Sequence, residues 1–279
     1  MKTSSNNQRL RIAAVQMSSG PDVSKNLAQA RELLERAVER GAEWVAFPEN
    51  FALFADTPEQ VLEVAESLKT SFLVETLQEW AAENDVWILG GSLPLKKGKA
   101  KPTQSSVLVD PDGECVAQYD KIHLFDAETV DSQGLSRSHQ ESTRFSAGKK
   151  PVLAETPWGL AGLSICYDLR FPELYRMYSE KGAALLFVPS AFTEVTGKAH
   201  WDVLTRARAI ENQCYVIAPA QWGENGKQSR THGHTRIVDP WGRILAEQMA
   251  GPGVVVAQLD FAELEKVRGR MPTHAHRKL

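Results

Sequence analysis

Short apolar runs alternate with stretches of helical periodicity along almost the whole of this sequence. Leu10–Met17 and Trp44–Phe47 have the length and the apolar content of buried strands. Between them, Leu27, Leu34 and Val38 recur at the spacing that places side chains on one face of a helix. Because alternating strands and helices are typical of sheets covered by helices, the sequence predicts a mixed α/β fold. The pattern alone does not distinguish a doubly wound sheet from a two-sheet sandwich.

The same criteria predict elements over the rest of the chain. Helices are expected at 58–68, 71–84, 172–181 and 200–213, and strands at 86–95, 105–110, 115–119, 159–166, 183–188, 214–219, 233–238, 242–246 and 253–259. Pro111-Asp112-Gly113 should form the turn of a hairpin, because Pro fixes one backbone dihedral angle and Gly permits a positive one. In the helix at 200–213, Val203, Ala207 and Ile210 share one face, and Asp260 is a candidate cap for a last helix.

Residues 126–150 are polar, with scattered Gly and Ser, and are expected to form a long loop. A loop of this length in a compact domain is often functional. No internal repeat or flexible linker interrupts the pattern. We therefore expect one domain at 9–270, with flanking tails at 1–8 and 271–279.

The charge and cysteine content narrow the class of protein. With 32 Lys and Arg against 35 Asp and Glu, the net charge of -3 gives no reason to expect binding to nucleic acid or to an anionic membrane. The polar segment 1–8 predicts no signal peptide, and no uncharged apolar run approaches the length of a membrane span. Three cysteines, Cys115, Cys166 and Cys214, are too few for a disulfide framework and fit a reducing compartment. These features predict a cytoplasmic protein.

Three polar residues stand where predicted strands end, and together they could hydrolyse an amide. Glu49 follows Trp44–Phe47, Lys121 follows the strand at 115–119, and Cys166 closes the strand at 159–166. Strand ends are where open α/β folds collect catalytic groups. A cysteine thiol is mostly protonated at neutral pH, so a nucleophilic cysteine needs a base such as a carboxylate. A lysine would offset the repulsion between carboxylate and thiolate and would stabilise the oxyanion of a tetrahedral intermediate.

Each of these residues also has a simpler interpretation. A lone cysteine at a strand end is usually a small buried apolar residue, and we interpret Cys115 and Cys214 in this way. A lone Glu or Lys at a strand end is usually a solvated or paired charge. If Cys166 is the nucleophile, the backbone N–H of Tyr167 is a candidate second donor to the oxyanion, because the turn after the cysteine leads into a helix.

Three ordered motifs favour the catalytic interpretation. They are Phe47-Pro48-Glu49-Asn50, Tyr119-Asp120-Lys121-Ile122-His123-Leu124-Phe125 and Cys166-Tyr167-Asp168-Leu169-Arg170-Phe171-Pro172-Glu173. They resemble the glutamate, lysine and cysteine motifs of the nitrilase superfamily, the carbon–nitrogen hydrolases, and the resemblance covers nearly the whole chain. It implies an αββα sandwich, subunits that pair into homo-oligomers such as homodimers, and amide hydrolysis without a cofactor. It also implies a second glutamate in the segment 126–150, where Glu141 matches the position better than the competing acid Glu128.

A narrower resemblance concerns the substrate. Pro189–Phe192, Thr196–Trp201, Arg206–Gln213, Gly233-His234 and Val238–Gly242 resemble a branch of amidases that act on deaminated glutathione. That resemblance implies cleavage to 2-oxoglutarate and cysteinylglycine through a thioester at Cys166. Arg170 could bind a substrate carboxylate or could form a structural ion pair at a helix start. The residues from Asn50 onward differ from those of the related omega-amidases, which bears on the exact substrate. An omega-amidase acting on 2-oxoglutaramate stays open as an alternative, because its substrate has the same acyl half. A non-catalytic binding protein on the same fold also stays open.

Two other kinds of site are less well supported. His123 could pair with Cys166 as in a Cys–His protease, but the local cysteine context of papain-like enzymes is missing. The pairs His232-x-His234 and His274-x-His276 could ligate a metal, yet no third ligand set accompanies them. The sequence therefore predicts a small-molecule amide as substrate and no metal.

Overall fold

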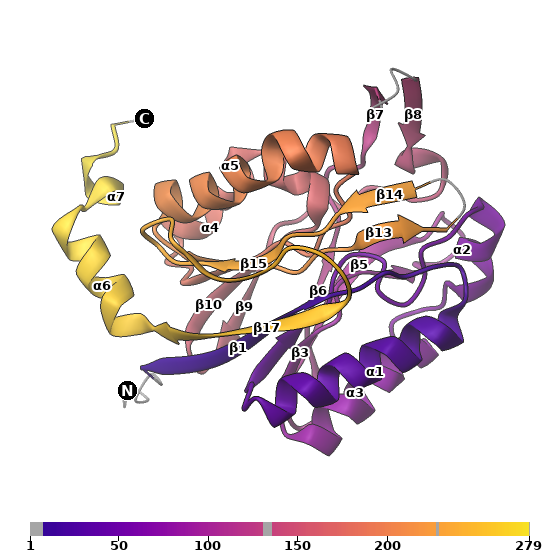
Figure 1. Cartoon of the computed structure of the whole chain (residues 1–279), viewed down its shortest axis with the longest axis horizontal. Helices are drawn as coiled ribbons and strands as arrows, with labels where there is room; N and C mark the ends of the chain where they lie inside the picture. The colour runs from indigo at the N-terminus through magenta and orange to yellow at the C-terminus, as the bar shows by residue number, and fades with distance from the viewer. Residues whose placement is uncertain (1–7, 131–135, 227–228, 279) are drawn as a thin grey trace.

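Two large β-sheets pack face to face at the centre of the molecule, and helices cover the outer face of each sheet (Figure 1). The computed structural model describes residues 8–130, 136–226 and 229–278. Helices α1 (Val23–Glu39) and α3 (Phe72–Asn84) lie on one side of the sheet pair, and α4 (Pro172–Glu180) and α5 (Glu194–Asn212) lie on the other. This arrangement confirms the αββα fold class and favours the sandwich over a doubly wound sheet.

The first sheet has the strand order β17-β1-β2-β3-β5-β4, and β6 also pairs with β5. Its strands are β1 (Arg9–Gln16), β2 (Trp44–Ala46), β3 (Trp87–Leu89), β4 (Leu93–Leu95), β5 (Thr103–Val109), β6 (Cys115–Asp120) and β17 (Gly253–Asp260). The neighbours β1, β2 and β3 are parallel, so their carboxyl ends lie at the same edge. Helix α2 (Pro58–Val64) packs beside β4.

The second sheet has the strand order β16-β15-β12-β11-β10-β9. Its strands are β9 (Val152–Thr156), β10 (Gly159–Leu163), β11 (Leu185–Phe187), β12 (Tyr215–Ala218), β15 (Thr235–Val238) and β16 (Ile244–Gln248). Strands β10, β11 and β12 are parallel, so this sheet also has one edge where carboxyl ends gather. The chain closes with α6 (Phe261–Arg270), which Asp260 caps as predicted, and with α7 (Thr273–His276).

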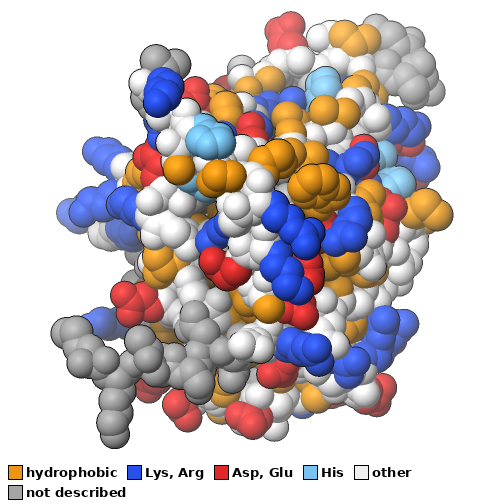
Figure 2. Space-filling model, turned by 90° about the vertical axis from the view of Figure 1, so that its left-hand side faces the viewer, with side chains coloured by type: hydrophobic (Ala, Val, Ile, Leu, Met, Phe, Trp, Pro, Cys, Tyr) orange, Lys and Arg blue, Asp and Glu red, His pale blue; other side chains and the backbone are white. Residues whose placement is uncertain are grey.

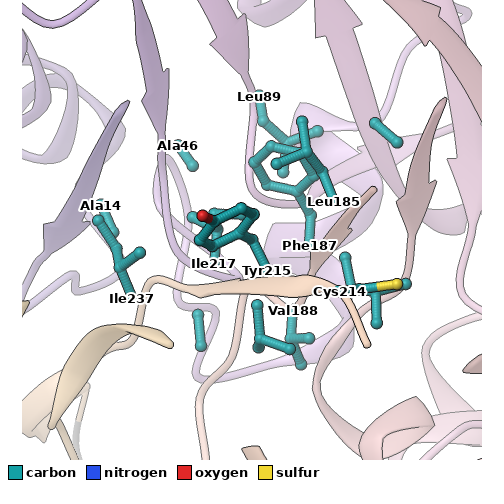
Figure 3. Packing of buried hydrophobic residues seen from close by; sticks show 14 of the residues in the cluster. Ala14, Ala46, Leu89, Leu185, Phe187, Val188, Cys214, Tyr215, Ile217 and Ile237 are labelled. Atoms are coloured by element: carbon teal, nitrogen blue, oxygen red, sulfur yellow. The ribbon is translucent and has the colours of Figure 1, made fainter. Parts of the chain in front are cut away.

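Side chains alternate between the two faces along each strand, so the first sheet contributes to two apolar cores, one between the sheets and one beneath the helices. On β1, Ile12 and Ala14 belong to the core between the sheets, whereas Ala13 and Val15 pack with α1 and α3. Figure 3 shows part of the core between the sheets, including Ala14, Ala46 and Leu89 of the first sheet and Leu185, Phe187, Ile217 and Ile237 of the second. Strands β2 and β11 are buried on both faces and are apolar throughout, which is why the sequence shows them as continuous runs.

Several predicted boundaries are wrong. The strand predicted at 86–95 is two strands, β3 and β4, because Gly90-Gly91-Ser92 turns the chain between them. The predicted loop at 126–150 contains the hairpin of β7 (Asp126–Val130) and β8 (Ser136–Gln140), followed by the 3-10 helix η1 (Glu141–Thr143). The side chains of β7 and β8 are mostly polar, so no regular alternation of apolar and polar residues marked these strands. Residues 131–135 lie outside the described residues.

Three further parts of the second half were not predicted correctly. Strand β9 and the hairpin of β13 (Trp222–Asn225) and β14 (Ser229–His232) were missed. Helix α5 begins at Glu194 instead of 200, since the Thr193 side chain caps it by accepting the N–H of Thr196. The face of α5 that carries Val203 and Ile210 is its exposed face: these side chains are 65% and 44% exposed.

Candidate active site

Glu49 lies just beyond the carboxyl end of β2 and its side chain is buried. The backbone here passes so close to Gly91 that a Cβ at position 91 would lie 1.9 Å from the Pro48 carbonyl oxygen. Gly91 also has a φ of +38°, so glycine is required on both counts. The next residue, Asn50, has a φ of +58° and donates its backbone N–H to Ser92 Oγ at 2.8 Å. The turn that aims Glu49 is therefore fixed by its surroundings.

Lys121 follows β6 directly, and its ammonium group occupies the centre of a buried polar cluster. Its Nζ lies 2.8 Å from Glu49 Oε1 and 2.8 and 2.9 Å from the two carboxylate oxygens of Glu141. Gln104 Oε1 lies 3.4 Å from the same nitrogen, and the Lys121 side chain is 1% exposed. A buried ammonium needs opposite charges around it, and the two carboxylates supply them.

Glu141 begins η1, directly after the hairpin of β7 and β8, and its carboxylate contacts Lys121. Its Oε2 accepts the backbone N–H of Phe125 at 2.6 Å, which holds this loop against the segment that carries Lys121. The competing acid Glu128 is exposed on β7. The structure thus places Glu141, and not Glu128, against Lys121.

Cys166 is the first residue of the 3-10 helix η2 (Cys166–Arg170), beyond the end of β10. Its φ of +47° lies in the left-handed region, which costs a non-glycine residue about 1 kcal/mol or more. Its N–H donates to the Pro189 carbonyl at 2.9 Å and helps to hold this conformation. The thiol lies near the Glu49 carboxylate, the Lys121 ammonium group and the Ala191 backbone N–H. Cys166, from the second sheet, therefore meets Glu49 and Lys121, from the first.

The charges of the cluster decide the protonation of its members. Burial raises the pKa of the Cys166 thiol well above its usual value, and the negative charge of Glu49 adds to this. Burial by itself would lower the pKa of Lys121. The negative charges of Glu141 and Glu49 outweigh this effect and hold the pKa of Lys121 well above its usual value. Burial also raises the pKa of Glu141. The free enzyme therefore holds a protonated thiol beside a carboxylate and a charged ammonium, which suits proton transfer from sulfur during attack.

Tyr167 and Arg170, the two predicted substrate-binding residues, both belong to η2 and are half-buried. Tyr167 follows Cys166 in the first turn of the helix, where backbone N–H groups lack partners within the helix. The Arg170 guanidinium lies 5.8 Å from the Tyr167 ring centroid and 5.1 Å from that of Phe192. Its Nη1 lies 3.1 Å from His200 Nδ1. Within the described part of the chain Arg170 has no carboxylate partner. The alternative interpretation of Arg170 as half of a structural ion pair is therefore not supported by these residues.

Asp168 stands two residues after Cys166 in the third motif, but no role was predicted for it from the sequence. Asp168 is fully buried. Its Oδ2 accepts the Tyr119 hydroxyl at 2.7 Å and the Ile165 N–H at 2.8 Å. Its Oδ1 accepts the His123 N–H at 3.1 Å and lies 2.7 Å from His123 Nδ1. Asp168 thus ties the Lys121 segment to the Cys166 segment, and it is the partner of His123 in place of the thiol.

The first of the two histidine pairs considered as metal ligands has another arrangement. His232 and His234 stack with ring centroids 4.4 Å apart, and His234 Nδ1 lies 3.0 Å from Glu247 Oε1. Among the described residues, no three His, Cys, Asp or Glu side chains gather as metal ligands. Over the same residues, no helix has both the length and the apolar character needed to cross a membrane.

Comparison with known proteins places this site in a family. The carbon–nitrogen hydrolase family model matches residues 11–269. A Synechocystis protein named deaminated glutathione amidase is 46% identical over 95% of this chain and 97% of its own length.

Two solved structures share the fold over almost the entire chain. The Caenorhabditis elegans NitFhit protein has a TM-score of 0.88 at 37% identity, covering 97% of this chain and 65% of that longer protein. Saccharomyces cerevisiae Nit3, a member of branch 10 of the nitrilase superfamily, has a TM-score of 0.86 at 32% identity, covering 98% and 97%. The chain therefore belongs to the carbon–nitrogen hydrolase family, within the nitrilase superfamily.

Proposed function

We propose that this carbon–nitrogen hydrolase is a deaminated glutathione amidase, which releases cysteinylglycine and 2-oxoglutarate. The observation that carries the proposal is the buried cluster in which Lys121 contacts Glu49 and Glu141 beside the Cys166 thiol. This cluster has a nucleophile, a base and an oxyanion-stabilising cation within reach of one another. The proposed substrate rests on the name of the Synechocystis relative, 46% identical over nearly its full length.

Acylation begins when Cys166 Sγ attacks the amide carbonyl carbon. The thiol proton passes to the Glu49 carboxylate as the carbon–sulfur bond forms and the carbonyl oxygen becomes an oxyanion. Lys121 Nζ and the Tyr167 backbone N–H donate to that oxyanion. Collapse of the intermediate breaks the carbon–nitrogen bond, and the proton on Glu49 goes to the departing nitrogen of cysteinylglycine.

Deacylation repeats the same proton transfers with water. Glu49 accepts a proton from water as the water oxygen bonds to the thioester carbon, and Lys121 again stabilises the oxyanion. The carbon–sulfur bond then breaks, 2-oxoglutarate leaves, and the proton on Glu49 returns to the Cys166 sulfur. Glu141 holds Lys121 in place and partners its charge, as the 2.8 Å contact between them allows.

Arg170 is the proposed anchor for a substrate carboxylate. It lies in the same short helix as Cys166, is half-buried, and its guanidinium contacts His200 and lies over the rings of Tyr167 and Phe192. A partly desolvated guanidinium without a carboxylate partner is a ready anion site.

Arg170→Gln should therefore raise KM for the dicarboxylate substrate by roughly ten- to hundredfold, the value of a charge-assisted hydrogen bond, and should change kcat less. Arg176→Gln, on α4, is the matched control, because Arg176 donates to the Glu211 carbonyl and takes no part in the proposed site. Steady-state kinetics of both variants makes the comparison. An unchanged KM in Arg170→Gln would remove Arg170 from the site.

The substrate assignment is tested by kcat/KM for deaminated glutathione against 2-oxoglutaramate. The two amides share an acyl group and differ in the leaving group, so the ratio reports on recognition of the cysteinylglycine half. We expect deaminated glutathione to be preferred. A clear preference for 2-oxoglutaramate would make the protein an omega-amidase with the same mechanism, and no turnover of either would overturn the proposed substrate.

We further propose that the protein forms homo-oligomers, most simply homodimers, through the exposed face of α5. Val203 and Ile210 on this face are joined by Trp241, which is 56% exposed in the turn after β15. A Cβ on Gly242 would lie 2.6 Å from the Ile210 side chain, so this turn packs against α5. At one end of the molecule, Figure 2 shows exposed hydrophobic side chains lying among Lys and Arg side chains. Monomeric proteins rarely expose such apolar patches to water, so we expect a second subunit to cover this face. Light scattering that reported only monomer would contradict the proposal.

A cytoplasmic location is also proposed. The three cysteines are unpaired, as expected of a protein in a reducing compartment. Recovery of the protein outside the cytoplasm on cell fractionation would contradict this location.

A further inference from the structure

Glu49 and Cys166 lie on different sheets, so the distance between base and nucleophile depends on how the two sheets are joined at this edge. The apolar core between the sheets sets their spacing, but apolar contacts do not fix a position along the sheet as directional hydrogen bonds do. A buried residue that bonds to both catalytic segments would do so. Gln221, in the segment after β12, is such a residue, and its side chain is fully buried.

The side chain of Gln221 holds the Glu49 segment. Its Nε2 donates to the Glu49 carbonyl oxygen at 3.0 Å and to Ser19 Oγ at 2.8 Å. Its Oε1 accepts the Ser19 backbone N–H at 3.0 Å. Ser19 Oγ in turn donates to the Phe51 carbonyl at 2.8 Å. The residues on both sides of the left-handed Asn50 are therefore held, directly or through Ser19, by one side-chain amide from the segment after β12.

The backbone of Gln221 holds the Cys166 segment. Its N–H donates to the Ser190 carbonyl at 2.9 Å. The residues on either side of Ser190 both lie beside Cys166: the Pro189 carbonyl accepts the Cys166 N–H at 2.9 Å, and the Ala191 N–H lies near the thiol. A single residue thus bonds through its side chain to the base segment and through its backbone to the segment that orients the nucleophile.

We infer that Gln221 is a positioning residue for catalysis, which holds the Glu49 carboxylate at the distance from Cys166 that proton transfer needs. The inference rests on the proposed function, because it requires Glu49 to act as the base toward Cys166. Gln221 itself touches neither the thiol nor the substrate carbon. A small displacement of a reacting group is enough to matter, since about 1 Å of misplacement can cost on the order of 100-fold in rate.

A second buried glutamine provides a matched control. Gln16 is also fully buried at the end of β1 and also joins the two sheets. Its Nε2 donates to the Gly251 carbonyl at 2.8 Å, and its Oε1 accepts the Thr235 N–H at 2.9 Å. It forms no hydrogen bond with Glu49, Lys121, Glu141 or Cys166 within the part of the chain that is described. Removing its hydrogen bonds should cost stability of the same kind without moving the base.

The test replaces each glutamine by methionine, which is unbranched and of similar length but makes no comparable hydrogen bonds. For deaminated glutathione, or for whichever amide the wild type hydrolyses, we expect Gln221→Met to lower kcat by about ten- to hundredfold while KM stays within about twofold. Gln16→Met should lower the unfolding temperature to a similar extent and leave kcat within about twofold. If Gln221→Met does not fold, Ser19→Ala removes the hydroxyl between Gln221 and Phe51 and should give a smaller loss of kcat.

The decisive comparison repeats Gln221→Met in a Glu49→Gln background. If Gln221 acts through Glu49, its loss should cost less than about threefold there, because the effects of coupled residues are not additive. An equal loss of kcat in both backgrounds would mean a merely structural role and would overturn the inference. So would an unchanged kcat in Gln221→Met, or an equal loss in Gln16→Met. Failure of the proposed function would show separately, as Glu49→Gln retaining full activity.

Discussion

Cys166→Ala should abolish turnover while leaving the protein folded. The reaction proceeds through a covalent thioester, and alanine leaves no nucleophile in the site, so activity should fall by at least about ten-thousandfold. The side chain is small and its backbone is held by the Pro189 carbonyl, which the substitution leaves in place. Amide hydrolysis measured by product release, together with thermal unfolding of the same preparation, separates loss of chemistry from loss of fold.

The other two cysteines are the controls for this result. Cys214 is buried against the Ala183 carbonyl at 3.0 Å, and Cys115 lies on β6. Burial raises the pKa of Cys214 to about 11, so its thiol stays protonated at neutral pH. Alanine at either position should retain turnover, apart from a loss of packing. Full activity in Cys166→Ala would end the thioester mechanism.

Lys121→Ala and Glu49→Gln should have the next largest effects. Removing Lys121 takes away the side-chain oxyanion donor, which should cost about a hundred- to a thousandfold in kcat. Glu49→Gln removes the base and should cost about a hundred- to ten-thousandfold. Lys121→Ala also leaves the Glu49 and Glu141 carboxylates buried without their cation, so thermal unfolding should shift to lower temperature as well. Because glutamine is nearly isosteric with glutamate, Glu49→Gln measures the chemistry with less disturbance of the fold.

His123→Ala distinguishes this mechanism from a Cys–His pair. His123 pairs with Asp168 and stacks on Phe171, with ring centroids 3.6 Å apart. Loss of the His123 side chain should therefore lower the stability of the fold, and it should reduce kcat far less than Lys121→Ala does. An essential His123 with a dispensable Lys121 would reverse the assignment of roles.

The strand ends could be predicted because the buried runs before them are unambiguous. Strands β2 (Trp44–Ala46) and β10 (Gly159–Leu163) carry no polar side chains, so Glu49 and Cys166 stand out as residues with reactive side chains just after apolar strands stop. Glu141 could not be found in this way. It follows a hairpin with polar strands, and only the family resemblance distinguished it from Glu128.

Tertiary contacts account for what the sequence did not reveal. Local periodicity cannot tell which face of α5 meets the core, since its buried face includes Thr205, Arg208 and Asn212 while Val203 is exposed. Gln221 gives no sequence signal either, because its bonds to Ser19 and Glu49 join positions far apart in the chain. Asp168 stood inside a recognised motif, but its role depends on contacts with the segment around Lys121.

The most direct test of the mechanism is to find the acyl group on the enzyme. Turnover of deaminated glutathione would be quenched in acid, and the peptides of the protein would be mapped by mass spectrometry. The expected result is a 2-oxoglutaryl group, held as a thioester, on the peptide that contains Cys166 and on neither peptide that contains Cys115 or Cys214. An acyl group on another residue, or steady turnover by Cys166→Ala, would contradict the account.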